Sequence, residues 1–129
     1  MGKRNNNQQK ILLIEDEGLL SEMYCSKLSK EGFKVSQAAN GKEGLELAKK
    51  EKFDLILLDI ILPKLDGFKV LEELKGDKAT KEIPVFLLTN LSQSEDLKRG
   101  AALGADDYLV KTDFTPTQVV EKIKKVLTK

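Results

Sequence analysis

The chain has 129 residues, of which 40% are hydrophobic and 33% are charged, and its formal net charge is +1. These values predict one soluble globular domain without an overall attraction to nucleic acid or to an anionic membrane. The chain contains no histidine, which excludes imidazole-dependent catalytic triads, histidine-ligated zinc and a histidine phosphocarrier. Its single cysteine, Cys25, cannot form an internal disulfide, so we expect a reducing compartment, the cytoplasm.

Residues 1–9 are polar and rich in Asn and Gln, so we expect a disordered tail followed by a single domain over residues 10–129. No stretch approaches the roughly 20 apolar residues of a membrane span, so we expect no membrane insertion. The predicted elements follow in this order: strand 10–14, helix 18–30, strand 34–38, helix 40–50, strand 54–59, helix 67–75, strand 84–88, helix 92–103, strand 108–110 and a final helix with Thr115 as N-cap and Pro116 at its first position. Strands that alternate with helices through short connections indicate an α/β fold with a parallel sheet and helices on both faces.

The stretch from Phe53 to Pro63 is the most informative part of the chain. Its branched apolar residues show no polar alternation, which is typical of a central parallel strand covered on both faces. The run ends in Asp59, and a turn containing Asp66 and Gly67 follows. Open α/β sheets place their chemistry at the carboxyl ends of strands, so Asp59 is a candidate functional residue.

Other predicted strands also end in polar residues, at the same edge of the sheet. Glu15 and Asp16 follow the first strand, Thr89 ends the fourth and Lys111 follows the fifth. Carboxylates that converge repel one another, and a hard divalent cation such as Mg²⁺ relieves that repulsion. A carboxylate nucleophile, a metal ion and nearby donors are a set suited to phosphoryl transfer.

Each of these residues taken alone has an ordinary structural interpretation. Asp59 alone is more often a turn or helix-cap residue, and Glu15 with Asp16 would serve as a capping cluster. Thr89 is common in strands, and Lys111 alone would be a solvated lysine. Their joint occurrence at successive strand ends favours the functional interpretation.

The motifs ILLIEDE, LILLDIILPKLDG, VFLLTN and GADDYLVK, in this order, resemble the receiver domain of bacterial two-component response regulators. The resemblance covers residues 10–127 and is greatest to the stand-alone receivers of the chemotaxis type. It implies a flavodoxin-like (βα)5 fold, a doubly wound parallel sheet with strand order 2-1-3-4-5.

The resemblance also implies a role for each residue of the acidic edge. Asp59 matches the aspartate that a partner histidine kinase phosphorylates. Glu15 and Asp16 match the acidic pair that holds Mg²⁺, and the backbone carbonyl of Ile61 matches a further ligand of that ion. Glu15 replaces the commoner aspartate, and its longer side chain can still reach the metal through water.

Three further positions match residues on the other side of the phosphorylation site. Thr89 and Lys111 match the residues that hold the phosphoryl group. Tyr108 matches the aromatic switch residue that couples phosphorylation to the surface of the fourth helix, fifth strand and fifth helix. The family usually has a cis proline after the lysine; Thr112 stands there, so we expect a trans peptide, or a strained cis one, and a shifted loop.

The function that follows is a phosphorylation-dependent switch that is no enzyme beyond its own phosphorylation and autodephosphorylation. The implied partners are a histidine kinase or histidine phosphotransferase and a downstream protein, with a phosphorylation-dependent dimer as a further option and no direct binding of nucleic acid. One alternative is a Mg²⁺-dependent phosphatase of the haloacid-dehalogenase type, which needs a second aspartate where this chain has Ile61. Another is an interaction module that is never phosphorylated.

Overall fold

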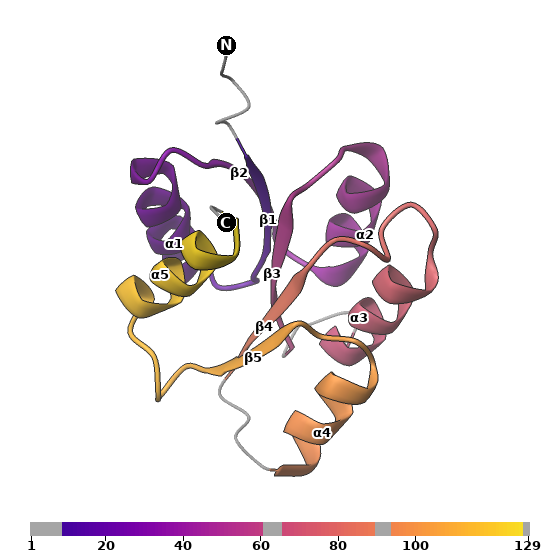
Figure 1. Cartoon of the computed structure of the whole chain (residues 1–129). Helices are drawn as coiled ribbons and strands as arrows, with labels where there is room; N and C mark the ends of the chain where they lie inside the picture. The colour runs from indigo at the N-terminus through magenta and orange to yellow at the C-terminus, as the bar shows by residue number, and fades with distance from the viewer. Residues whose placement is uncertain (1–8, 61–65, 90–93, 128–129) are drawn as a thin grey trace.

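A computed structural model describes residues 9–60, 66–89 and 94–127 (Figure 1). Strands and helices alternate along the chain: β1 (Lys10–Ile14), α1 (Gly18–Lys30), β2 (Lys34–Ala38), α2 (Gly41–Lys50), β3 (Leu55–Asp59), α3 (Gly67–Gly76), β4 (Val85–Thr89), α4 (Ser94–Ala102), β5 (Asp107–Val110) and α5 (Pro116–Leu127). The strands form one parallel sheet in the order β2-β1-β3-β4-β5. This arrangement confirms the predicted flavodoxin-like fold.

Helices cover both faces of the sheet, with α1 and α5 on one face and α2, α3 and α4 on the other (Figure 1). Alternate residues of each strand point to opposite faces, so β1 and β3 contribute to two cores. Leu12 and Leu58 belong to the core beneath α2 and α3. Leu13 and Leu57 belong to the core beneath α1 and α5. Every residue of β3 is buried, as its unbroken apolar sequence predicts.

Side-chain caps fix the starts of α2 and α5, and the sequence predicts the second of these caps. Asn40 caps α2 by accepting a hydrogen bond of 2.9 Å from the Glu43 backbone N–H. Thr115 caps α5, because its Oγ1 accepts from the Gln118 N–H at 3.1 Å while the Gln118 side chain accepts from the Thr115 N–H at 2.8 Å. These reciprocal bonds place Pro116 at the first position of α5, where its missing N–H costs nothing.

Some element boundaries differ from the prediction for reasons of hydrogen bonding. Asp54 precedes β3, and its carboxylate accepts from the Lys10 N–H at 2.7 Å. Pro84 precedes β4, where its carbonyl accepts from the Ile56 N–H at 2.9 Å. The expected start of the fourth helix at Ser92 lies outside the described residues.

The amino ends of the strands form the edge of the sheet opposite Asp59, which we call the amino edge. There the Lys75 ammonium contacts the Ile83 carbonyl at 2.9 Å, the Lys81 carbonyl at 3.4 Å and Asp106 Oδ2 at 3.2 Å. The same Asp106 oxygen accepts from the Val85 N–H at 2.8 Å. These bonds join α3 to the starts of β4 and β5.

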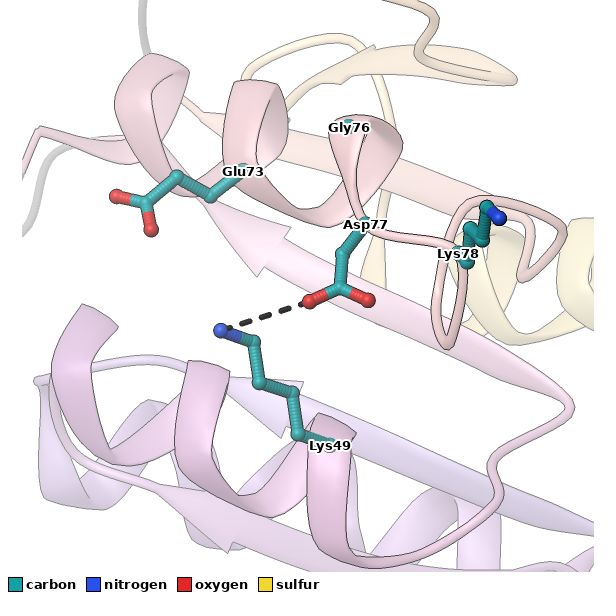
Figure 2. A pocket seen from close by; sticks show the side chains of 5 residues that line it. All are labelled: Lys49, Glu73, Gly76, Asp77 and Lys78. Atoms are coloured by element: carbon teal, nitrogen blue, oxygen red, sulfur yellow. Dashed lines mark ion pairs between the residues drawn. The ribbon is translucent and has the colours of Figure 1, made fainter.

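A pocket of about 540 Å³ lies between the ends of α2 and α3. Lys49 and Asp77 face one another across it, with 3.6 Å between Nζ and Oδ2 (Figure 2). Their side chains are largely exposed, so this ion pair contributes at most about 1 kcal/mol.

The expected tail, residues 1–9, lies outside the described part except for Gln9. The Gln9 side chain donates a hydrogen bond of 2.9 Å to the Leu127 carbonyl at the end of α5. Its backbone carbonyl accepts from the Lys34 N–H. Within the described residues, none of the helices has the length and apolar composition needed to cross a membrane.

Candidate functional site

Two neighbouring strands bring three carboxylates together at the carboxyl ends of the strands, which we call the carboxyl edge. Ile14 of β1 pairs with Leu58 of β3, so Glu15 and Asp59 are the next residues on adjacent strands. Asp16 follows at the turn into α1. One carboxylate oxygen from each of Glu15, Asp16 and Asp59 lies within 4.8 Å of the other two. The predicted convergence of these residues is confirmed.

Two of these carboxylates are removed from solvent. Glu15 is 3% exposed and Asp59 is 6% exposed, whereas Asp16 is exposed. Glu15 Oε2 accepts from the Glu17 N–H at 3.2 Å. Its other oxygen, Oε1, is buried and accepts no hydrogen bond from the described residues. A buried carboxylate oxygen without a hydrogen-bond donor is costly, so Oε1 would gain from a bound cation.

Lys111 supplies positive charge to the two buried carboxylates. Its backbone N–H donates to the Thr89 carbonyl at 2.7 Å, which fixes where the chain leaves β5. Its ammonium lies 3.1 Å from Asp59 Oδ2 and 3.5 Å from Glu15 Oε1. The Lys111–Thr112 peptide is trans, as expected, and the ammonium still reaches the carboxylates.

The imbalance of charge changes the acidity of the buried groups. Burial, followed by the neighbouring Asp59 carboxylate, raises the pKa of Glu15 from 4.5 to about 7, although Lys111 opposes the change. Burial lowers the pKa of Lys111, but the Asp59 and Glu15 carboxylates outweigh it and raise that pKa above 10.5. Lys111 therefore stays charged at neutral pH while Glu15 titrates there.

These residues fit a hard divalent cation. Carboxylate oxygens are the ligands that Mg²⁺ prefers, and the unsatisfied Glu15 Oε1 is directed at the same cluster. A cation would also relieve the repulsion between Glu15 and Asp59. The expected further ligand, the carbonyl of Ile61, lies outside the described residues.

Thr89 and Tyr108 lie on the two strands beyond Asp59. Asp59 pairs with Leu88, so Thr89 is one residue further along the adjacent strand, and its side chain is fully buried. Tyr108 pairs with Leu87 and is half-buried. Burial, followed by the charge of Asp96, raises the pKa of Tyr108, so its hydroxyl remains protonated at neutral pH.

The structure adds residues that sequence reasoning did not single out. Tyr24 of α1 is 2% exposed, and its burial together with the charges of Glu15 and Asp59 raises its pKa to about 12. Gly67 begins α3 and donates a hydrogen bond of 2.8 Å to the Ile60 carbonyl, next to Asp59. A Cβ at Gly67 would collide with the Ile60 backbone. The Asp-Gly pair in the sequence predicted a turn at this position. It did not predict that the Gly67 backbone packs against the Ile60 backbone.

Comparison with known proteins gives consistent results. The sequence profile of the response regulator receiver domain matches residues 11–124. The chain is 40% identical to the DNA-binding dual master transcriptional regulator RpaA of Synechocystis, covering 92% of this chain and 48% of that protein. It is 36% identical to the probable transcriptional regulator ycf27 of Cyanidium caldarium, covering 97% of this chain and 49% of that protein. The chain thus spans about half the length of these curated relatives.

Among solved structures, the chain is similar to the chemotaxis protein CheY4 of Vibrio cholerae. The two share 31% sequence identity and superimpose with a TM-score of 0.86. The similarity covers 93% of this chain and 99% of that one. The fold is therefore shared with a protein of known structure.

Proposed function

Because this chain belongs to the response regulator receiver domain family, we propose that it is a phosphorylation-dependent signalling switch of a two-component system. In this proposal Asp59 accepts a phosphoryl group from a histidine kinase or a histidine phosphotransferase. The chain acts as a signalling module and catalyses only its own phosphorylation and autodephosphorylation. We propose that it acts in the cytoplasm, and its single cysteine, which cannot form an internal disulfide, supports this.

The neighbours of Asp59 carry the proposal. One carboxylate oxygen from each of Glu15, Asp16 and Asp59 lies within 4.8 Å of the other two, close enough to share a cation. The Lys111 ammonium lies 3.1 Å from Asp59 Oδ2, and the buried Thr89 ends the adjacent strand β4. The acceptor carboxylate therefore has potential metal ligands and potential hydrogen-bond donors beside it.

The reaction follows from this arrangement. A carboxylate oxygen of Asp59 attacks the phosphorus of a phosphohistidine, the new O–P bond forms as the N–P bond breaks, and the leaving imidazole takes a proton from water. Lys111 and the Thr89 hydroxyl then donate to the phosphoryl oxygens, which stabilises the charge they carry.

The proposed metal ligands are Asp16, Asp59 and, directly or through water, Glu15, with the carbonyl of Ile61 beside them. Bound there, Mg²⁺ would neutralise charge on the oxygens of the transferred group. Glu15 and Asp59 would meanwhile orient the ion, because their burial limits the positions that their carboxylates can take.

The output is a change in the surface formed by α4, β5 and α5. Tyr108 lies in β5, which pairs with the strand that ends in Thr89, and this adjacency supports a joint response of the two residues. We propose that this surface binds a downstream protein or a second copy of the chain.

Incubation with acetyl phosphate and Mg²⁺, followed by intact mass measurement, tests the proposal. We expect a single phosphoryl addition that disappears in Asp59→Asn and in the presence of EDTA. The matched control is Asp54→Asn, which removes a carboxylate from the other end of β3 and is expected to leave the addition intact. Sustained release of phosphate from several phosphomonoesters would indicate the phosphatase instead, and the absence of any adduct would indicate an unphosphorylated interaction module.

A further inference from the structure

Helix α4 is held to the rest of the domain by few buried side chains. Of its nine residues, all of which the structure describes, only Gly100 is buried. Helix α3 of ten residues buries Gly67, Phe68, Val70, Leu71 and Leu74. An element with little buried apolar surface has a low local stability, so individual contacts decide the position of α4.

Gly100 brings the backbone of α4 directly against Tyr108. A Cβ at Gly100 would lie 2.9 Å from Leu87 Cδ1 and 3.0 Å from Tyr108 Cδ2. These distances are shorter than normal carbon contacts, so a larger residue at position 100 would require the Leu87 side chain or the Tyr108 ring to shift. A movement of α4 therefore changes the space available to the Tyr108 ring.

The residue before Gly100 attaches α4 to the start of α3. The Arg99 guanidinium carbon lies 4.3 Å from the centroid of the Phe68 ring. Its Nη2 lies 3.9 Å from Asp66 Oδ2, while Asp66 Oδ1 accepts from the Phe68 N–H at 2.9 Å and caps α3. We call Arg99 with Asp66 and Phe68 the Arg99 latch.

The charges show that the latch depends on Asp66. The amino end of a helix carries a partial positive charge, which repels a guanidinium. The Asp66 carboxylate compensates for this repulsion, and the face of the Phe68 ring attracts the cation. An uncharged cap at residue 66 would preserve the helix start but weaken the latch.

The same turn of α3 touches the backbone beside Asp59. Gly67 lies between Asp66 and Phe68, and its N–H donates to the Ile60 carbonyl at 2.8 Å. Because the two backbones are in contact at Gly67, a displacement of Ile60 must displace the first turn of α3. Successive contacts therefore connect Asp59 to α4 through Ile60, Gly67 and the Arg99 latch.

We propose that the Arg99 latch holds α4 in its resting position and couples phosphorylation of Asp59 to α4 through α3. This inference rests on the proposed function, because it assigns the latch to the unphosphorylated state. A phosphoryl group adds charge and bulk one residue from Ile60, which shifts the first turn of α3 and releases Arg99. Released from the latch, α4 changes its contact with Tyr108 at Gly100.

Hydrogen exchange of the α4 amides, with and without beryllofluoride and Mg²⁺, tests the latch in the full chain. Beryllofluoride coordinates a carboxylate as a stand-in for a phosphoryl group. In Arg99→Ala without beryllofluoride, we expect exchange in α4 to be roughly two- to five-fold faster, as the loss of one exposed cation–π contact implies. We also expect beryllofluoride to bind more tightly by a similar factor in calorimetry, because the resting state no longer competes.

Two variants make the test specific. Asp66→Asn keeps a capping side chain and is expected to change both measurements in the same direction as Arg99→Ala. Lys98→Ala removes the same charge one residue earlier in α4, and we expect both values to match the unmodified protein. Unchanged α4 exchange in Arg99→Ala, or an equal change in Lys98→Ala, would overturn the latch.

The two readouts separate the latch from the function on which it rests. Faster α4 exchange without tighter beryllofluoride binding would overturn the coupling, because the latch would then be unconnected to Asp59. If the unmodified protein fails to bind beryllofluoride at all, the proposed function fails. In that case the exchange measurement still decides whether Arg99 holds α4.

Discussion

The two edges of the sheet use the same kinds of charged side chain with opposite results. At the amino edge, the Lys75 ammonium has three oxygen partners, and Asp106 accepts from both Lys75 and a backbone N–H. At the carboxyl edge, Lys111 faces the buried carboxylates of Glu15 and Asp59, and one Glu15 oxygen has no donor among the described residues. At the amino edge the charged groups have partners within the protein. At the carboxyl edge the Glu15 oxygen would gain a partner only from a further cation. Chemistry is therefore expected where the charges are unbalanced.

The largest expected effect comes from removing the ammonium of the carboxyl edge. In Lys111→Met we expect phosphorylation by acetyl phosphate to slow by roughly 100- to 1000-fold, the usual effect of deleting one preorganised donor to a transition state. The rate is measured by intact mass over time. Lys75→Met removes the same charge from the amino edge and should leave this rate unchanged; an equal loss of rate in both variants would contradict the comparison.

Gly67 and Gly76, at opposite ends of α3, allow the tightness of packing at the two edges to be compared. Gly67→Ala places a Cβ against the Ile60 backbone, so we expect the free energy of unfolding to fall by about 3 kcal/mol. Gly76→Ala meets no atom within 4 Å, so stability should stay the same or rise by up to about 1 kcal/mol. Urea unfolding of both variants measures the difference. Equal stabilities would show that the close contact between the Gly67 and Ile60 backbones is not needed for stability.

The stability of the metal-free protein should depend on pH through Glu15. Its folded pKa of about 7 exceeds the ordinary 4.5, so the folded state retains a proton that the unfolded state has lost. Unfolding in EDTA should therefore become easier as pH rises from about 4.5 to 7, by on the order of 2–3 kcal/mol. Glu15→Gln should flatten this profile, and so should saturating Mg²⁺; a wild-type profile that is already flat would contradict the assignment.

The smallest effect is expected at the amino edge, where each charge has its partners. Lys75→Met should lower the free energy of unfolding by about 1–2 kcal/mol, because it leaves the Ile83 carbonyl and Asp106 without their shared donor. Urea unfolding in the presence and absence of Mg²⁺ measures this loss. The loss of unfolding free energy should be the same in both conditions. A loss that depends on Mg²⁺ would show that the two edges are energetically coupled.

The sequence predicted those features that depend on the local order of apolar, polar and capping residues along the chain. The unbroken apolar run before Asp59 indicated a central buried strand, and polar residues at strand ends indicated the cluster of Glu15, Asp16 and Asp59. The cap at Thr115 was also predicted, because capping uses side chains within three residues of the helix start. The assigned roles of the site residues remain predictions until phosphorylation is measured.

Contacts between distant segments could not be predicted in this way. The position of Arg99 over Phe68 depends on how α4 is oriented against α3, and no local pattern encodes that orientation. The close approach of Gly100 to Tyr108 and the bond between Lys75 and Asp106 depend in the same way on the packing of separate elements. Strand boundaries shifted by a residue because backbone partners, as at Asp54, determine where a ladder begins.

The hydrogen bond between Gln9 and Leu127 has a practical consequence for engineering. Because β1 begins and α5 ends at the amino edge, this bond places the first and last described residues next to one another there, at the end of the sheet opposite Asp59. A short linker could join them, and a circular permutant opened at the exposed turn near Lys78 would keep every strand in the sheet. A fluorophore attached beside Gln9 would likewise leave the carboxyl edge accessible to a macromolecule that delivers a phosphoryl group.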